Sequence, residues 1–132
     1  MNKGFLMSNN DVVQLSYNYD SEVDALTLRA QEEYQYSASL EVNPNLIIDV
    51  STDKKVMAFE ILDAKHYFEI DGKYLDNADF IITVTVNEDV IKSEFILITM
   101  DNQTRKAYRV SSKAINEEYV ENGLFKYVTI GV

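Results

Sequence analysis

Three carboxylates lie close together near the start of the chain, Asp20, Glu22 and Asp24 in the stretch NYDSEVDALTLRA. Hard cations such as Ca²⁺ and Mg²⁺ take several oxygen ligands, so this D-x-E-x-D spacing could supply part of a cation site. The Gly and the distal Glu of a calcium-binding loop are both missing here. The spacing therefore favours a turn, in which Asp20 ends one strand and accepts backbone N–H groups, Asp24 starts the next strand, and Glu22 is solvated.

The only histidine, His66, is a second candidate for chemistry. A catalytic base needs a nucleophile or an orienting carboxylate within hydrogen-bond reach, and Asp63 and Glu69 are near it only in sequence. A histidine on the flank of a helix is the favoured interpretation. No Gly-rich phosphate loop or nucleophile elbow is present either. We predict no catalytic, metal-binding or cofactor-binding residue, and retain as acidic surface candidates Asp20, Glu22, Asp24, Asp63 and the neighbouring His66.

The charge of the chain argues against several partners. Twelve Lys and Arg stand against twenty-two Asp and Glu, which gives a formal net charge of −10. Nucleic acids and anionic lipids would repel such a chain. The one cationic stretch, TRKAYR at 104–109, alternates along an expected strand, so its side chains would divide between two faces. We expect neither nucleic acid nor membrane as partner, and the acidity points to a basic protein.

Cysteine and hydropathy bear on location. The chain has no Cys, which removes disulfides and thiolate chemistry and fits a reducing cytoplasm. The apolar run within the first eleven residues is too short for a signal peptide. The longest apolar runs, FIITVTVN and FILITM, are far shorter than a membrane-spanning helix. A cytoplasmic location is expected.

Apolar and polar residues alternate with a period of two along most of the chain that must position these residues, which is typical of half-buried strands. Alternation over 13–19 and 26–30 predicts a hairpin joined by DSEVD. Alternation continues over 36–42 and over 46–50, with a break at NPN between the two runs. The stretch KVMAFEIL is apolar at both parities, which predicts a central strand. Further strands are expected at 80–86, SEFILITM, RKAYRVS and LFKYVTIGV.

Two short helices are expected among these strands. Asp63 can cap a helix over AKHYFEI that ends at Gly72, although EIDGKYL also contains the Asp-Gly of a tight hairpin, and the helix is the favoured interpretation. Ser112 can open a second helix through Val120. The links are too short for most parallel crossovers. The predicted fold class is therefore mainly β, a β-rich α+β fold with a predominantly antiparallel sheet or sandwich. We expect a single domain over 1–132, with a β core at 17–66 and a β-rich extension at 67–132 packed on it.

The stretches YDSEVDALTLRA and LIIDVSTDKKVMAFEILDA resemble a small prokaryotic family, domain of unknown function 2283. The residues that carry the resemblance lie in four groups: Tyr19 and Asp20; Asp24, Ala25 and Leu26; Ile48, Asp49 and Asp53; and Glu60 to Ala64. This chain has Lys54 and Ala58 where the family usually has Gly, and Thr27 where an aromatic is common. Lys54 makes its turn less able to adopt a positive φ.

The resemblance implies no established activity. It implies a small companion of other proteins, sometimes encoded beside a toxin-like protein. We therefore expect a non-enzymatic protein-interaction or assembly module, with a basic partner or with itself as a homodimer that protects its sheet edges. The alternative is a small-ligand-binding protein or hydrolase-like enzyme with a cleft lined by carboxylates and tyrosines. A pocket joining Asp20 or Asp63 with His66 would favour this alternative, and an exposed apolar patch would favour interaction.

Overall fold

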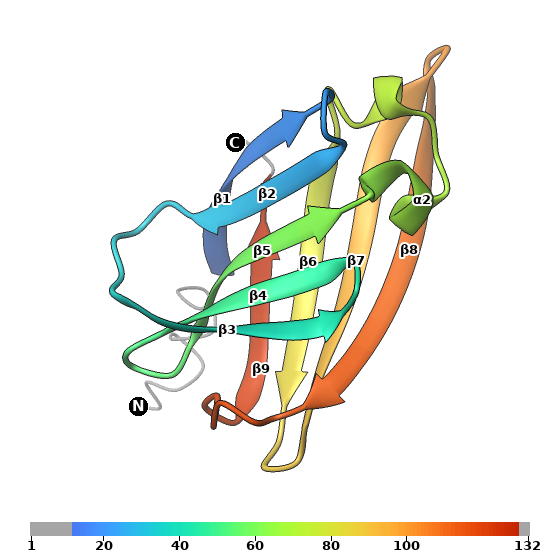
Figure 1. Ribbon diagram of the computed structural model, residues 1–132. Coiled ribbons are helices and arrows are strands. Elements are labelled where there is room, and N and C mark those ends of the chain that lie inside the picture. The colour runs from blue at the N-terminus through green and yellow to red at the C-terminus, as the bar shows by residue number, and fades with distance from the viewer. Residues whose placement is uncertain (1–11, 130–132) are drawn as a thin grey trace, which may run out of the picture.

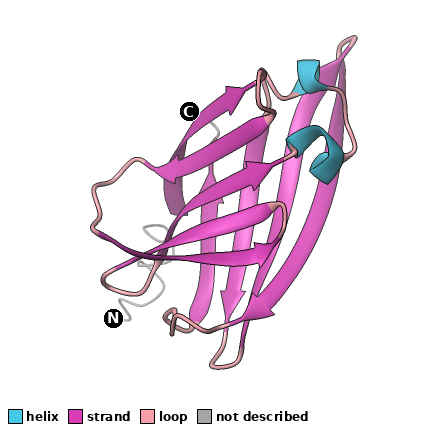
Figure 2. Ribbon diagram, viewed as in Figure 1, coloured by secondary structure: helices cyan, strands magenta, loops and turns pink. Residues whose placement is uncertain are grey.

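A computed structural model describes residues 12–129 of the protein. Nine strands and two very short helices make up this part of the chain (Figure 2). In chain order the elements are β1 (Val12–Asp20), β2 (Ala25–Ala30), β3 (Tyr36–Asn43), β4 (Leu46–Ser51), β5 (Val56–Leu62), α2 (Ala64–Phe68), the 3₁₀ helix η2 (Gly72–Tyr74), β6 (Asp79–Val86), β7 (Val90–Asp101), β8 (Thr104–Ile115) and β9 (Gly123–Val128).

All nine strands belong to one sheet, in the order β3-β4-β5-β2-β1-β9-β6-β7-β8. The sheet curls on itself, so that β1 to β5 form one layer and β9, β6, β7 and β8 form the other (Figure 1). The expected mainly β class is confirmed. The sheet is mixed, however, because β1 runs parallel to β9, with Val12 beside Lys126. We expect few parallel pairs from the sequence because the links between successive strands are short. This pair escapes that argument, because β1 and β9 are connected by nearly the whole described chain.

The hydrophobic core lies between the two layers. Alternation places Phe80, Ile82 and Val84 of β6 on the inner side, and all three are buried. At the centre, the ring of Phe59 meets Phe95 at 5.4 Å and Tyr127 at 5.0 Å between centroids, both edge to face. Such aromatic pairs add about 0.5–1.5 kcal/mol beyond the area they bury. The β5 strand thus joins the two layers through its inward side chain.

The open side of the curled sheet is bridged by side chains. Ser112 on edge strand β8 accepts a hydrogen bond from the Asn43 amide at 3.2 Å, at the end of the other edge strand, β3. The Tyr67 hydroxyl of α2 lies 3.0 Å from the same Ser112 oxygen. The helix therefore covers part of the gap between the two edges (Figure 1).

The predicted hairpin is present, and the two runs on either side of NPN form another. The strands β1 and β2 pair antiparallel from Leu15 beside Ala30 to Asp20 beside Ala25, and β3 pairs antiparallel with β4 across the NPN turn. The strand predicted as central, β5, lies between β4 and β2. Its first half is buried, whereas Glu60 and Leu62 are exposed on the outer face.

The helix predictions need correction. The prediction of a helix from Ser112 to Val120 is wrong, because residues 112–115 complete β8 and pair with β7 over its full length. After this strand, the Asn116 amide closes a turn by bonding to Val120, with its Oδ1 accepting that residue's N–H at 2.8 Å. The other predicted helix exists but covers only Ala64–Phe68. It ends at Glu69 in the left-handed conformation instead of reaching Gly72, which opens η2.

In the part of the chain that the structure describes, no helix is both long and apolar enough to cross a bilayer.

Candidate functional site

The acidic stretch at the opening of the chain forms the turn between β1 and β2. The Asp20 carboxylate accepts the N–H of Glu22 at 3.0 Å, and Glu22 itself is exposed, both as predicted. Asp24 precedes β2 in the left-handed conformation, with φ of 54°. Asp and Asn tolerate this region better than most residues, because their short polar side chains can bond locally.

Asp24 is tied to a distant part of the chain. Its carboxylate oxygens accept the N–H of Lys65 in α2, each at 3.2 Å, and Oδ1 also accepts the Tyr19 hydroxyl at 2.7 Å. Its backbone oxygen accepts the N–H of Ala64 at 3.1 Å. Burial and, after it, the bond to Asp24 raise the pKa of Tyr19 to about 12. Asp24 is therefore the residue that holds the start of the helix.

Asp63 does not cap the helix with its side chain. It has a φ of 55° and forms no side-chain capping bond, so the cap predicted from it is supplied by Asp24. His66 is exposed in the same short helix. Among residues 12–129, no three His, Asp or Glu side chains converge in a way that would hold a metal ion. The structure thus brings Asp24 to the helix that carries His66 but assembles no chemical site from the sequence candidates.

A different set of carboxylates surrounds a cleft at the other end of the sheet. We call it the acidic cleft, and its volume is about 710 Å³. Its charged lining residues are the carboxylates Glu32, Glu33, Asp53 and Glu121 and the cation Lys55. Its apolar and aromatic lining includes Val13, Tyr34, Val56, Met57, Leu124, Phe125 and Tyr127. A cleft lined by carboxylates and tyrosines therefore exists, but neither Asp20, Asp63 nor His66 borders it.

Hydrogen bonds between distant segments fix the walls of the acidic cleft. Thr52 in the β4–β5 turn donates its N–H to the oxygen of Gln35 at 2.9 Å. Glu121 donates its N–H to the oxygen of Lys54 at 2.8 Å, which joins the segment before β9 to the same turn. At the floor, the Tyr127 hydroxyl donates to the oxygen of Val56 at 2.8 Å. The cleft is thus held mainly by main-chain contacts, which leave the acidic side chains available.

The electrostatics of the acidic cleft differ from one carboxylate to the next. Asp53 accepts a hydrogen bond from the Ser51 hydroxyl, and this bond lowers the pKa of the Asp53 carboxyl. By contrast, Glu32, Glu33 and Glu121 accept no side-chain hydrogen bond from other described residues. Burial and, to a smaller extent, the negative charge of Glu32 raise the pKa of Tyr127 well above its usual range. The Glu32 charge therefore acts on the Tyr127 hydroxyl at the base of the cleft.

This arrangement is suited to holding a cation. Carboxylates accept strong hydrogen bonds from ammonium and guanidinium groups, and aromatic faces attract the same groups. The sequence reasoning overlooked Glu32, Glu33 and Glu121 because they lie in connecting segments with no motif. The signal available was weak, namely the acidic pair directly before the Tyr in QEEYQ and the single Glu121 two residues after the Tyr in EEYVEN.

The comparisons with known proteins bear on identity. A curated protein of Methanosarcina mazei with the name "Putative hypoxanthine phosphoribosyltransferase" is 27% identical over 101 residues, which are 76% of this chain and 76% of that protein. No solved structure matches the chain. The family model described as "Protein of unknown function (DUF2283)" matches residues 16–65, which agrees with the resemblance drawn from the sequence. The similarity to the DUF2283 family thus covers residues 16–65, the part of the chain that forms most of β1 and all of β2 to β5.

Proposed function

We propose that this protein is a non-enzymatic interaction module whose acidic cleft receives a Lys or Arg side chain of a basic protein partner. The observation that supports the proposal most is the composition of the cleft, whose lining combines four carboxylates and one lysine with apolar and aromatic side chains. A cationic side chain with a long apolar stem matches both parts, because its stem can lie on apolar surface while its charge meets carboxylates. The proposal retains the cytoplasmic location expected from the sequence.

A small cationic ligand is the second candidate for the same cleft. Its volume of about 710 Å³ is within the range of small-molecule sites. The activity in the name of the M. mazei protein is not included, because a phosphoribosyl group carries negative phosphate and the cleft carboxylates would repel it. A diamine such as cadaverine carries charges that the cleft would attract.

Self-association as a homodimer stays a prediction, and the two edge strands of the sheet indicate which surface it would use. Edge strand β8 carries Arg105, Lys106, Arg109 and Lys113 within its length, and edge strand β3 is interrupted by irregular pairing near Tyr36 and near Asn43. Lysines and bulges on edges discourage strand-to-strand pairing with a second copy. A dimer would therefore use a face of the sheet.

The test is a titration of the full-length protein with a dye-labelled peptide that alternates Lys and Leu, followed by fluorescence anisotropy. The triple variant Glu32→Gln, Glu33→Gln, Glu121→Gln removes three cleft carboxylates but preserves side-chain size. We expect it to weaken binding by about tenfold or more, which corresponds to roughly 1.4 kcal/mol. Cadaverine should compete with the peptide only weakly.

A matched control removes the same number of charges elsewhere. The variant Glu22→Gln, Glu41→Gln, Glu60→Gln changes exposed carboxylates outside the cleft, and we expect it to alter the affinity by less than about twofold. Equal weakening by both variants would mean that net charge alone attracts the peptide, and the proposal would then be wrong. Cadaverine binding as tightly as the peptide would favour the small-ligand alternative.

A further inference from the structure

The outer face of β9, β6, β7 and β8 has a charge opposite to that of the whole protein. Successive residues of a strand point to opposite sides, so the register of these strands identifies the outward side chains. We call this surface the basic face. Its outward charged residues are five cations and two carboxylates: Lys92, Lys113, Lys126, Arg105 and Arg109, with Asp79 and Glu94. The chain as a whole carries −10, so cations are concentrated on this side.

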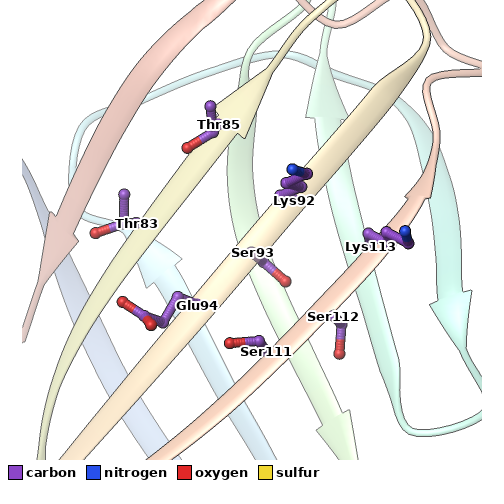
Figure 3. Close-up of a pocket in the computed structure, with 8 residues that line it drawn as sticks. All are labelled: Thr83, Thr85, Lys92, Ser93, Glu94, Ser111, Ser112 and Lys113. Atoms are coloured by element: carbon purple, nitrogen blue, oxygen red, sulfur yellow. The ribbon is translucent and has the colours of Figure 1, made fainter.

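Two lysines of the basic face stand directly opposite one another. Lys92 of β7 pairs in register with Lys113 of β8 (Figure 3). Like charges at opposed positions of neighbouring strands are unfavourable. Among the described residues, neither lysine has a carboxylate within 4.0 Å, since Glu94 pairs with Arg109 at 3.6 Å. An anion bound between the two lysines would relieve this repulsion.

The two lysines border an open groove of about 520 Å³. Thr83 and Thr85 of β6 and Ser111 of β8 also line it and present hydroxyl groups on the same outward side (Figure 3). A hydroxyl can donate a hydrogen bond to a carboxylate oxygen. Glu94 of β7 lines the groove as well, and its carboxylate pairs with Arg109. The groove thus combines two lysines and small donors with one carboxylate that is already paired.

Apolar side chains flank this polar groove. Eight large hydrophobic residues of the described chain are exposed, and four of them lie on this side of the sheet: Val12, Met100, Ile115 and Leu124. Of these, Leu124 and Ile115 lie beside the groove, whereas Met100 is at the far end of β7, opposite Arg105. Leu124 stands beside Thr85 in register, and Ile115 is two residues beyond Lys113. Exposed apolar residues gathered around a polar groove are typical of a protein-binding surface.

From these observations we infer that the basic face docks an acidic segment of a second protein, with carboxylates of the segment between Lys92 and Lys113 and its apolar side chains on Leu124 and Ile115. A nucleic acid fits less well. All aromatic residues of the four strands point inward, so no ring is offered for base stacking. Two copies facing each other through this surface would bring like charges together.

The experiment uses a dye-labelled peptide that alternates Glu and Leu, and the same peptide with Gln for Glu, at low ionic strength. We expect the acidic peptide to bind the full-length protein, and the variant Lys92→Gln, Lys113→Gln to weaken binding by about tenfold. The Gln peptide should not bind measurably. The control variant Lys65→Gln, Lys73→Gln changes two exposed lysines elsewhere and should alter the affinity by less than about twofold.

Further readouts distinguish the failures. Both variants should bind the Lys-Leu peptide as the wild type does, which shows that they are folded and keeps this inference separate from the acidic cleft. The inference is wrong if the acidic peptide does not bind or if the two lysine variants weaken it equally. It is also wrong if a single-stranded oligonucleotide binds the face more tightly than the peptide. Light scattering that shows a dimer in the wild type and a monomer in Lys92→Gln, Lys113→Gln would assign the face to a second copy instead.

Discussion

The β1–β2 turn and the β4–β5 turn are built alike but are used differently. Each contains a carboxylate that accepts a local hydrogen bond, Asp20 and Asp53 respectively. Each also holds a residue other than Gly in the left-handed region, Asp24 at φ 54° and Lys54 at φ 66°. The Asp24 side chain reaches across to α2, whereas Lys54 contributes main-chain groups alone: its N–H donates to the oxygen of Ser51, and its oxygen accepts the N–H of Glu121.

The difference shows where carboxylates remain available for binding. In the β1–β2 turn the fold uses the acidic side chains, because Asp20 closes the turn and Asp24 holds the helix. The β4–β5 turn instead forms one wall of the acidic cleft, where carboxylates from other segments gather around it. Acidic residues that are close in sequence therefore stabilise the fold, and the candidate site draws on residues that are far apart in sequence.

The largest expected effect is at Asp24. Asp24→Ala removes acceptors for the Lys65 N–H and the Tyr19 hydroxyl and leaves Ala in a strained conformation, so we expect the free energy of unfolding to fall by about 2 kcal/mol. Asp24→Asn keeps one oxygen and tolerates a positive φ, and should lose roughly half as much. Urea unfolding measures both values.

Glu22→Ala is the matched control in the same turn, since Glu22 is exposed and contributes only its N–H to the turn. Its effect should stay within about 0.5 kcal/mol. Similar losses in Asp24→Ala and Glu22→Ala would contradict the role given to Asp24. Stabilisation of the wild type by millimolar Ca²⁺ that Asp24→Ala abolishes would restore the metal interpretation of the turn.

The next effect concerns the hydrogen bond between Ser51 and Asp53. The bond lowers the folded-state pKa of Asp53, so its stabilisation is present above the ordinary Asp pKa of about 3.9 and is lost as pH falls through the folded value. Ser51→Ala should lower the free energy of unfolding by about 1 kcal/mol at neutral pH. The loss should be smaller at acidic pH, where Asp53 is protonated in both states.

Urea unfolding of the wild type and Ser51→Ala across this pH range provides the measurement. Asp53→Asn serves as the control, because it should remove the pH-dependent part of the stability. The buried Ser51 hydroxyl still accepts the N–H of Lys55, and its single hydrogen, which Asp53 accepts in the wild type, can turn to the backbone oxygen of Lys55. A loss that is the same at neutral and acidic pH would show that the hydroxyl acts without Asp53.

The smallest effect is a gain of stability. Lys54 has a φ of 66° at a position where Gly would be unstrained. Relief of this backbone strain by Gly favours the folded state, and the greater conformational entropy of Gly in the unfolded chain offsets part of this gain. Lys54→Gly should therefore raise the free energy of unfolding by roughly 0.5 kcal/mol. Lys55→Gly at the neighbouring position, which has no positive φ, should lower it. Thermal unfolding of both variants tests this, and a loss of stability in Lys54→Gly would contradict the explanation.

Much of the strand arrangement was predictable from the sequence, because hairpins depend on local patterns. Alternation in 13–19 and 26–30 fixes which side chains face the core, and Pro44 with its flanking Asn residues breaks the strand between β3 and β4. The helix predicted from Ser112 failed because a Ser before charged residues satisfies the rule for a helix start, while the pairing with β7 holds this segment in a strand. Tertiary contacts thus overrode the local preference.

The candidate site was not predictable in the same way. The segments 32–35, 52–57 and 121–127 meet only because the sheet curls and because β9 returns to β1. Nothing in the spacing of Glu32, Asp53 and Glu121 indicates this meeting. The capping role of Asp24 was equally hidden, since its partner Lys65 is 41 residues away in sequence. Local patterns contain no information about such distant contacts.

The parallel pair between β1 and β9 has a consequence for folding kinetics. When the chain is synthesised, β1 can pair with β2 early, but its other edge has no partner until the last strand emerges. Contacts between residues so far apart carry a large loop-closure entropy, and chains dominated by such contacts fold in milliseconds to seconds. The two layers are thus expected to join late in folding. Until they join, the apolar inner side of β6 and β7 stays exposed to solvent, because the layer of β1 to β5 has not yet packed against it. A chaperone that binds exposed strands would meet this protein at that stage.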